Sequence, residues 1–222
     1  MSNIPNFSLL NLIRCKYREE QDRDQRYFIM LASPVKGVLF TTQNSPQFIS
    51  GQIRVRGRSN GSYPYNYLEM IDTIFGEEEN TIEVCSGNIR NQVGANRCFG
   101  VDINPLTKPD LVADGQTLNG ILNNRFNRWR CDPPYNINTA KKMYRTNLPA
   151  PIKLLQAGAR VCKVGSLMFL LLGPQNYQPT PKGVKRIGWI AITVVPNNEV
   201  RALNIYYKYG DELESNRSTL VS

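Results

Sequence analysis

The chain has 222 residues, with 27 Lys and Arg against 18 Asp and Glu, so its formal net charge is +9. This length fits one domain with an extension, and a hydrophobic content of 41% excludes a disordered or collagen-like chain. The sequence contains no His, which excludes Ser-His-Asp and Cys-His catalysis and any zinc site that needs imidazole. The excess of positive charge favours a polyanionic partner.

The five cysteines form no CxxC pair, so the sequence indicates neither a zinc knuckle nor a redox motif, and we predict no metal site. The longest apolar runs, Tyr27–Ala32 and Leu167–Leu172, are far shorter than the roughly 20 residues of a membrane span. No apolar segment follows a basic start, so we expect no secretory signal. We therefore expect a cytoplasmic protein that contacts nucleic acid and no membrane.

The first 60 residues are the least regular part of the chain, and we predict an irregular N-terminal extension. Within it, Tyr27–Thr41 holds two apolar runs around Ser33-Pro34, which indicates a short hairpin. Further on, Arg54, Arg56 and Arg58 alternate, so an extended strand places them on one face, suited either to solvent or to phosphate contact. We assign residues 1–60 to the extension, 61–210 to the main domain and 211–222 to a polar tail.

The main domain begins with Tyr67–Phe75, whose apolar residues follow helical spacing. Helices are also expected at Leu118–Phe126 and Ile152–Val161. Short strand-like runs occupy Thr81–Cys85, Cys98–Ile103, Asp110–Ala113, Arg128–Cys131 and Val164–Leu172. This alternation predicts an α/β domain with a mostly parallel sheet and helices on both faces.

The end of the domain has a different pattern. Two strand-like runs, Ile187–Val195 and Arg201–Tyr209, are separated by the turn signal Pro196-Asn197-Asn198-Glu199. Adjacent strands joined by a tight turn are antiparallel, so we predict an antiparallel hairpin at the C-terminal edge of the sheet.

The strongest chemical signal is Asp132-Pro133-Pro134-Tyr135, directly after a predicted strand. The Asp132 carboxylate and the Pro133 carbonyl provide two acceptors for the N–H bonds of an exocyclic amine, which makes the nitrogen lone pair available. The two prolines hold these acceptors in place before the reaction. Tyr135 can stack on an extruded base.

Acidic residues also close the preceding strands. Glu83 and Asp102 are 19 residues apart, and Asp114 follows in the segment DLVADGQ. The carboxyl ends of parallel strands are where open α/β sheets bind ligands, and an acid about 20 residues after the first strand suits a ribose. Gly87 lets the backbone approach such a ligand.

These segments resemble the class I methyltransferases that use S-adenosylmethionine (AdoMet), in particular the amino-methyltransferases of nucleic acids. EVCSGN, VDINP, DLVADGQ and CDPPYN resemble that family's first cofactor motif, ribose motif, adenine-contact motif and catalytic motif. The resemblance covers about Tyr67–Tyr209 and implies a Rossmann-like sheet of seven strands with its last strand antiparallel. It implies these cofactor-binding residues: Glu83, Cys85, Gly87, Asp102, Ile103, Asp114 and Gly115. It implies these catalytic residues: Asp132, Pro133, Pro134 and Tyr135.

The resemblance implies methylation of adenine N6 in DNA, with the target base flipped out of the duplex. No long recognition insert is present, so recognition falls to the first 60 residues, to the basic loop 174–186 or to a partner subunit. The candidate nucleic-acid contacts, expected around the pocket, are Arg54, Arg56, Arg58, Lys141, Lys182, Lys185 and Arg186.

Several alternatives follow from the same residues. Cytosine-C5 methylation is excluded because no cysteine follows a proline, and Asp132 disfavours the glutamine methyltransferases, which usually carry Asn there. N4-cytosine methylation and methylation of RNA stay open, as does a non-catalytic subunit that binds AdoMet or nucleic acid.

Overall fold

The computed structural model describes residues 17–21, 27–31, 37–42, 45–56, 63–64, 67–89, 98–134, 136–144, 146–174, 180–195 and 199–210. Before residue 57 only the backbone of the strands is described, and Arg58, Tyr135 and the tail 211–222 lie outside the described residues.

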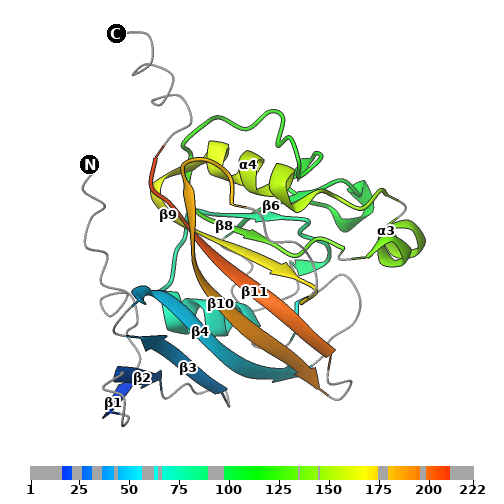
Figure 1. The fold of residues 1–222 in the computed structure, drawn as a ribbon. Helices are drawn as coiled ribbons and strands as arrows, with labels where there is room; N and C mark the ends of the chain where they lie inside the picture. Colours follow the sequence, from blue (N-terminus) through cyan, green and yellow to red (C-terminus); the bar gives the residue numbers. More distant parts are fainter. Residues whose placement is uncertain are drawn as a thin grey trace, which may run out of the picture.

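The described strands form one sheet in the order β1-β2-β3-β4-β10-β11-β9-β8-β5-β6-β7 (Figure 1). The last seven in sequence are β5 Thr81–Val84, β6 Cys98–Asp102, β7 Leu111–Val112, β8 Phe126–Cys131, β9 Cys162–Leu172, β10 Val184–Val195 and β11 Glu199–Lys208. Strands β7, β6, β5, β8 and β9 are parallel, and β11 is antiparallel to both of its neighbours, β9 and β10. The predicted mostly parallel order of these seven strands is confirmed, within a sheet that holds eleven described strands.

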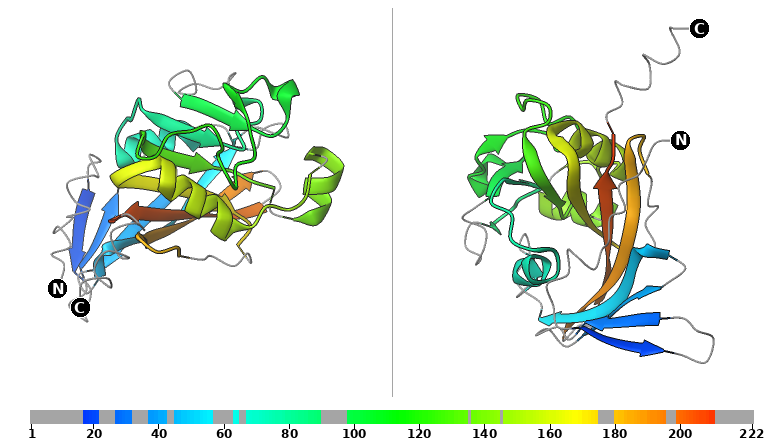
Figure 2. Two further views of the ribbon diagram at one scale, coloured as in Figure 1. Left: turned by 90° about the horizontal axis from the view of Figure 1, so that it is seen from above. Right: turned by 90° about the vertical axis from the view of Figure 1, so that its left-hand side faces the viewer.

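Helices pack on both faces of this sheet, as predicted (Figures 1 and 2). Helix α2, Tyr67–Phe75, contributes to one core together with Leu167, Phe169 and Leu171 of β9. Helix α4, Pro151–Val161, contributes to the other core, where the intervening residues of β9, such as Met168 and Leu170, are buried. Because strand side chains alternate between faces, one apolar strand supplies both cores.

The N-terminal extension is more regular than expected, because four strands form within it: β1 Tyr17–Gln21, β2 Tyr27–Leu31, β3 Gly37–Thr42 and β4 Ser45–Arg56. The predicted hairpin is confirmed, since β2 pairs antiparallel with β3. Strand β4 pairs parallel with β10, so the β10–β11 hairpin lies inside the sheet and not at its edge. The prediction of an irregular extension was therefore wrong for these segments. The domain boundary at residue 60 stays a prediction.

The helix predicted over Leu118–Phe126 was wrong, because turns precede β8 there. Leu118, Gly120 and Asn124 have φ of 47°, 87° and 52°, in the left-handed region that a right-handed helix cannot contain. Arg160 of α4 donates to the carbonyl oxygens of Thr117, Leu118 and Ile121, which holds the turns against that helix.

Helix α4 lies close to the sheet because Gly158 faces Trp129 of β8. A Cβ atom at position 158 would lie 2.7 Å from Trp129 Nε1 and 3.0 Å from Met168 Cε, and Trp129 is fully buried. Only glycine permits this approach of the helix to the strand.

The substitution Gly158→Ala is expected to lower the free energy of unfolding by about 1–3 kcal/mol, since the indole cannot move away inside a packed core. Urea denaturation measures this loss. Gly210→Ala is the control, because a Cβ there meets no atom within 4 Å. Equal stability of both variants would mean that α4 does not depend on this contact.

Candidate active site at the carboxyl ends of the strands

Residues predicted to carry the chemistry follow four neighbouring parallel strands. Cys85, Asp102 and Asp132 end or follow β5, β6 and β8, and Asp114 follows β7 by two residues. Since these strands are parallel and adjacent, their carboxyl ends share one edge of the sheet. The structure therefore brings the four segments together as predicted.

Asp102 organises the loop after β5. Its Oδ2 atom accepts a hydrogen bond from the Gly87 amide at 2.8 Å, and its Oδ1 atom accepts one from the Asn104 amide at 2.8 Å. Gly87 and Cys85 have φ of 49° and 57°, which turns the chain sharply as it leaves β5. Each carboxylate oxygen has a second lone pair, so Asp102 can still accept hydrogen bonds from a ligand hydroxyl.

Asp114 and Gly115 form the neighbouring loop after β7. Asp114 Oδ1 accepts from the Gln116 amide at 2.9 Å, and Gln116 Oε1 accepts from the Ala150 amide at the start of α4 at 2.9 Å. Gly115 is buried against β5, because a Cβ there would lie 2.5 Å from Val84 Cγ1 and 3.8 Å from Cys85 Sγ. The two loops thus meet over the end of β5.

The substitution Gly115→Ala is expected to lower the free energy of unfolding by about 1–3 kcal/mol, because the new methyl group pushes this loop away from β5. Val84→Ala removes the clashing Cγ1 atom. The double variant should therefore lose less stability than the sum of the two single variants, as measured by urea denaturation. Additive losses would mean that contact with Val84 does not hold the loop.

The Asp132-Pro133-Pro134 segment leaves β8 at this same edge. Pro133 is buried, and the Asp132 side chain is 17% exposed. Arg201 of β11 donates from Nη1 to Asp132 Oδ2 at 3.2 Å. Burial raises the pKa of Asp132 above its ordinary value, while the charge and hydrogen bond of Arg201 lower it. The Asp132 carboxylate is partly exposed, and Arg201 contacts only its Oδ2 atom, so Oδ1 can accept a hydrogen bond from an amine.

Glu83 lies on the face of β5 opposite to Ile82 and Val84, towards Tyr63 and α2. It is fully buried: Tyr63 Oη donates to its Oε1 atom, and Arg130 Nε donates to its Oε2 atom at 2.7 Å. Burial raises the pKa of Glu83, although Arg130 and the Tyr63 hydrogen bond act to lower it. This side chain joins β5 to β8, and its predicted contact with the cofactor stays a prediction.

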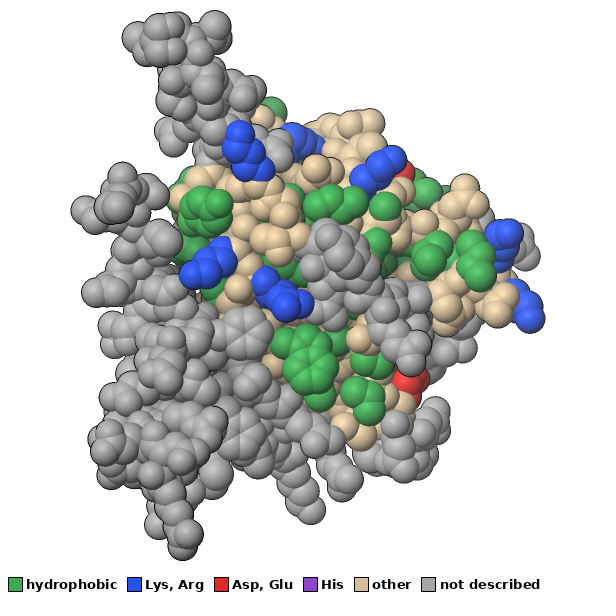
Figure 3. All heavy atoms as spheres, viewed as in Figure 1, with side chains coloured by type: hydrophobic (Ala, Val, Ile, Leu, Met, Phe, Trp, Pro, Cys, Tyr) green, Lys and Arg blue, Asp and Glu red, His purple; other side chains and the backbone are tan. Residues whose placement is uncertain are grey.

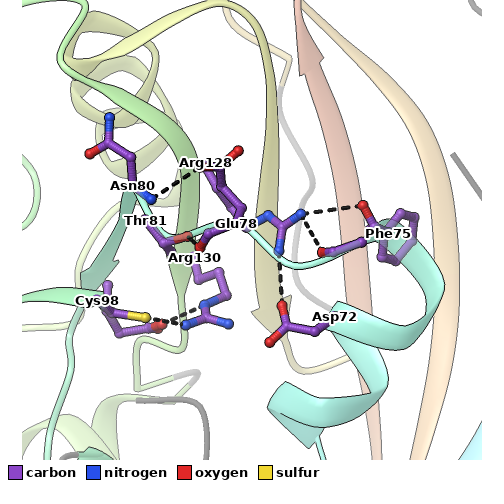
Figure 4. A network of polar contacts seen from close by, with 10 residues as sticks. Asp72, Phe75, Glu78, Asn80, Thr81, Cys98, Arg128 and Arg130 are labelled. Atoms are coloured by element: carbon purple, nitrogen blue, oxygen red, sulfur yellow. Dashed lines mark hydrogen bonds and ion pairs between the residues drawn. The ribbon is translucent and has the colours of Figure 1, made fainter. Parts of the chain in front are cut away.

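Sequence reasoning missed the buried contacts of the two arginines of β8, Arg128 and Arg130, which Figure 4 shows. Arg130 also reaches Cys98, while Arg128 pairs with Asp72 at 2.9 Å and donates to the Gly76 carbonyl at 2.8 Å, at the end of α2. Arg128 and Arg130 alternate within a strand that was predicted to be buried. This pattern indicates buried ion pairs, because buried charges need partners.

The cations predicted as nucleic-acid contacts fall into two groups. Lys141 is exposed on α3, Ile137–Tyr144, which begins five residues after Asp132. Arg54 and Arg56 lie at the end of β4, opposite Thr193 and Val195 of β10, and this end of β4 is at the edge that carries Asp132. Figure 3 shows the described Lys and Arg side chains of its face spread out and not gathered into one patch.

Lys182, Lys185 and Arg186 lie elsewhere. These residues lie near the start of β10, whereas the end of β10 lies at the edge that carries Asp132. Along an extended strand, Lys185 is about 30 Å from Val194 at that end. The expected cationic rim around the pocket therefore does not include these three residues. Their contact with nucleic acid stays a prediction, as does that of Arg58 and the stacking by Tyr135, which lie outside the described residues.

Two further findings concern the described residues alone. No group of three His, Cys, Asp or Glu side chains among them is arranged to hold a metal ion. None of the helices found there has the length and apolar character that crossing a membrane requires.

The strand order β7-β6-β5-β8-β9-β11-β10, with β11 antiparallel, gives this chain the fold of class I methyltransferases. No protein-family model matches the sequence, and no curated protein matches it. The fold assignment therefore rests on the strand order and on the position of the loops.

Solved structures with a similar arrangement include TrmN from Thermus thermophilus, at 13% identity and a TM-score of 0.40, covering 58% of this chain and 43% of that chain. The likeness thus spans less than half of TrmN. A SAM-dependent methyltransferase from Aquifex aeolicus matches at 9% identity and a TM-score of 0.39, covering 59% and 84%. The antibiotic-resistance methyltransferase Kmr matches at 15% identity and a TM-score of 0.35, covering 59% and 86%. At these values the likeness carries no argument about function.

Proposed function

We propose that this protein is an AdoMet-dependent methyltransferase that places a methyl group on the exocyclic N6 atom of adenine in DNA. One observation carries the proposal: the Asp132-Pro133-Pro134 segment leaves β8 at the edge of the sheet where the loop after β5, held by Asp102, meets the Gly115 loop. An acceptor pair for an amine thus lies beside a candidate nucleoside site.

The residues at this edge fit the cofactor. Asp102 is partly exposed and keeps lone pairs for ribose hydroxyls, and the neighbouring Ile103 is 48% exposed, which provides an apolar wall for an adenine ring. Glycine at position 115 keeps the loop against Val84 and leaves the edge open. Asp102, Ile103, Asp114 and Gly115, with the Cys85–Gly87 backbone, would hold AdoMet. When bound, AdoMet supplies a methyl group activated by a sulfonium.

The chain's own residues act on the target amine. The Asp132 Oδ1 atom and the Pro133 carbonyl accept its two N–H bonds, and the Asp132 carboxylate stabilises the positive charge that develops on nitrogen. The buried Pro133 keeps both acceptors fixed. Tyr135 stacks on the flipped base. A strong base is unnecessary because the methylated, positively charged amine is a strong acid that loses its extra proton to water, which agrees with a sequence that lacks His.

DNA is the proposed polymer because of the net charge of +9 and of the basic residues at the edge of the site. Lys141 is exposed there, and the backbone of Arg54 and Arg56 ends β4 at that edge. Each Lys or Arg that contacts a phosphate steepens the salt dependence of binding by about one unit. The first 60 residues, the basic loop 174–186 or a partner subunit would supply the sequence recognition, since the sequence holds no long recognition insert.

The test is transfer of labelled methyl from AdoMet to duplex DNA, single-stranded DNA and total RNA, followed by mass analysis of the nucleosides. N6-methyladenine in DNA supports the proposal. N4-methylcytosine would keep the chemistry and change the base, and product in RNA alone would change the polymer. AdoMet binding without any product would make the chain a non-catalytic subunit and overturn the proposal.

A further inference from the structure

An arginine that no sequence motif indicates lies beside the proposed catalytic carboxylate. Arg201 is near the start of β11, and its Nη1 atom lies 3.2 Å from Asp132 Oδ2, with both side chains 17% exposed. Strand β9 separates β8 from β11, and Leu172, its last residue, pairs with Ala202. Arg201 therefore reaches past the end of β9 to contact Asp132.

A second carboxylate holds the arginine from its other side. Arg201 Nε lies 3.5 Å from Glu199 Oε1, and the Glu199 side chain is 38% exposed. Arg201 and Glu199 belong to the same strand and oppose Ile192 and Val194 near the end of β10, which places this pair at the carboxyl edge. The result is a row of three charges, Glu199, Arg201 and Asp132, that runs from solvent into the site.

We propose that Arg201 is a positioning residue for the reaction, an inference that rests on the proposed function. The Arg201 guanidinium donates a hydrogen bond to Asp132 Oδ2 and fixes the orientation of the carboxylate plane. The described residues provide no hydrogen-bond partner for Asp132 Oδ1. This oxygen is thereby directed at the target amine. An acceptor misplaced by 1 Å costs about 100-fold in rate, which is the effect that such positioning prevents.

The charges around Asp132 make the proposal testable by pH. Burial raises the pKa of Asp132, Arg201 lowers it and Glu199 raises it. The other titratable groups that interact with Asp132 come from α2 and the segment before it, from β5 and from β8: Tyr67, Tyr63, Glu83 and Cys131. Burial raises the pKa of both tyrosines and of Cys131, so they are uncharged near neutral pH, and Glu83 is paired with Arg130.

The experiment compares Arg201→Gln and Arg201→Lys with Glu199→Gln in the full chain, with DNA as substrate. Arg201→Gln is expected to lower kcat about 100-fold with unchanged AdoMet affinity, and Arg201→Lys, which keeps the charge, should recover part of the loss. Lys163→Gln is the control, because it removes one exposed positive charge near the start of β9, away from the site.

The acid limb of the pH profile is the decisive readout. Without Arg201 the pKa of Asp132 rises, so the rate should begin to fall at higher pH than in the wild type. Without Glu199 the pKa falls, so the limb should move to lower pH. A residue with a merely structural role would lower the rate without these opposite shifts, and unmoved limbs would overturn the proposal.

A measurement without turnover separates this proposal from the proposed function. In protein labelled with ¹³C at aspartate carboxyl groups, the Asp132 signal is assigned by its loss in Asp132→Asn and titrated in wild type and Arg201→Gln. A higher midpoint in the variant supports the control of Asp132 by Arg201, even if no nucleic acid is methylated and the proposed function fails. An unchanged midpoint would falsify the positioning role, whatever the methylation assay gives.

Discussion

Replacing Asp132 by Ala should lower methyl transfer about 1000-fold or more while AdoMet binding stays within about threefold of the wild type. The carboxylate is the charged acceptor at the end of β8, and Arg201 already holds one of its oxygens. Its loss removes the acceptor for the amine and the charge that stabilises the developing cation. Asp102 and Gly115 lie at or after the ends of other strands, so the loops proposed to hold AdoMet stay in place.

Single-turnover transfer and calorimetric AdoMet titration measure the two effects separately. Asp132→Asn is the matched variant, because it keeps the shape and one acceptor oxygen and should lose less than the alanine variant. Glu79→Gln removes an exposed carboxylate away from the site and should leave the rate unchanged. Near-normal turnover of Asp132→Ala would show that this carboxylate does not act on the amine.

Replacing Arg130 by Met should destabilise the fold by about 3–5 kcal/mol near neutral pH. Arg130 and Glu83 are 2% and 0% exposed, and their ion pair at 2.7 Å joins the neighbouring strands β8 and β5. Methionine leaves Glu83 buried with Tyr63 as its hydrogen-bond partner, and the cost is that of an uncompensated buried charge.

The loss should depend on pH in a defined direction. Burial already raises the pKa of Glu83, and removal of Arg130 raises it further. A carboxyl whose pKa is higher in the folded than in the unfolded state is tolerated while protonated and destabilises the fold as pH rises through its folded pKa. The deficit should therefore be smaller at about pH 5 than at about pH 8, as measured by urea denaturation.

The double variant Glu83→Gln/Arg130→Met is the control for this interpretation. It removes both charges and keeps an acceptor for Tyr63, so it should recover most of the lost stability. A double variant as unstable as Arg130→Met would mean that the packing of the arginine, and not its charge, supports the sheet.

The sequence by itself determined the parts of this protein that depend on local order. Short apolar runs alternating with longer connections predict the parallel strands. Parallel strands end at one edge of a sheet, so the sequence also predicts that Asp102, Asp114 and Asp132 share an edge. The turn before Glu199 likewise predicted the antiparallel hairpin β10–β11.

Only the tertiary structure decided which distant residues meet. The insertion of β11 between β9 and β10 brings Arg201 to Asp132, 69 residues away in sequence, and carries Lys185 and Arg186 to the opposite edge. Local patterns hold no information on strand order, because hydrogen bonds between backbones are the same whichever strands pair. Likewise, the side chain that neutralises buried Glu83 is chosen by the register of β5 on β8, which a single strand's sequence does not encode.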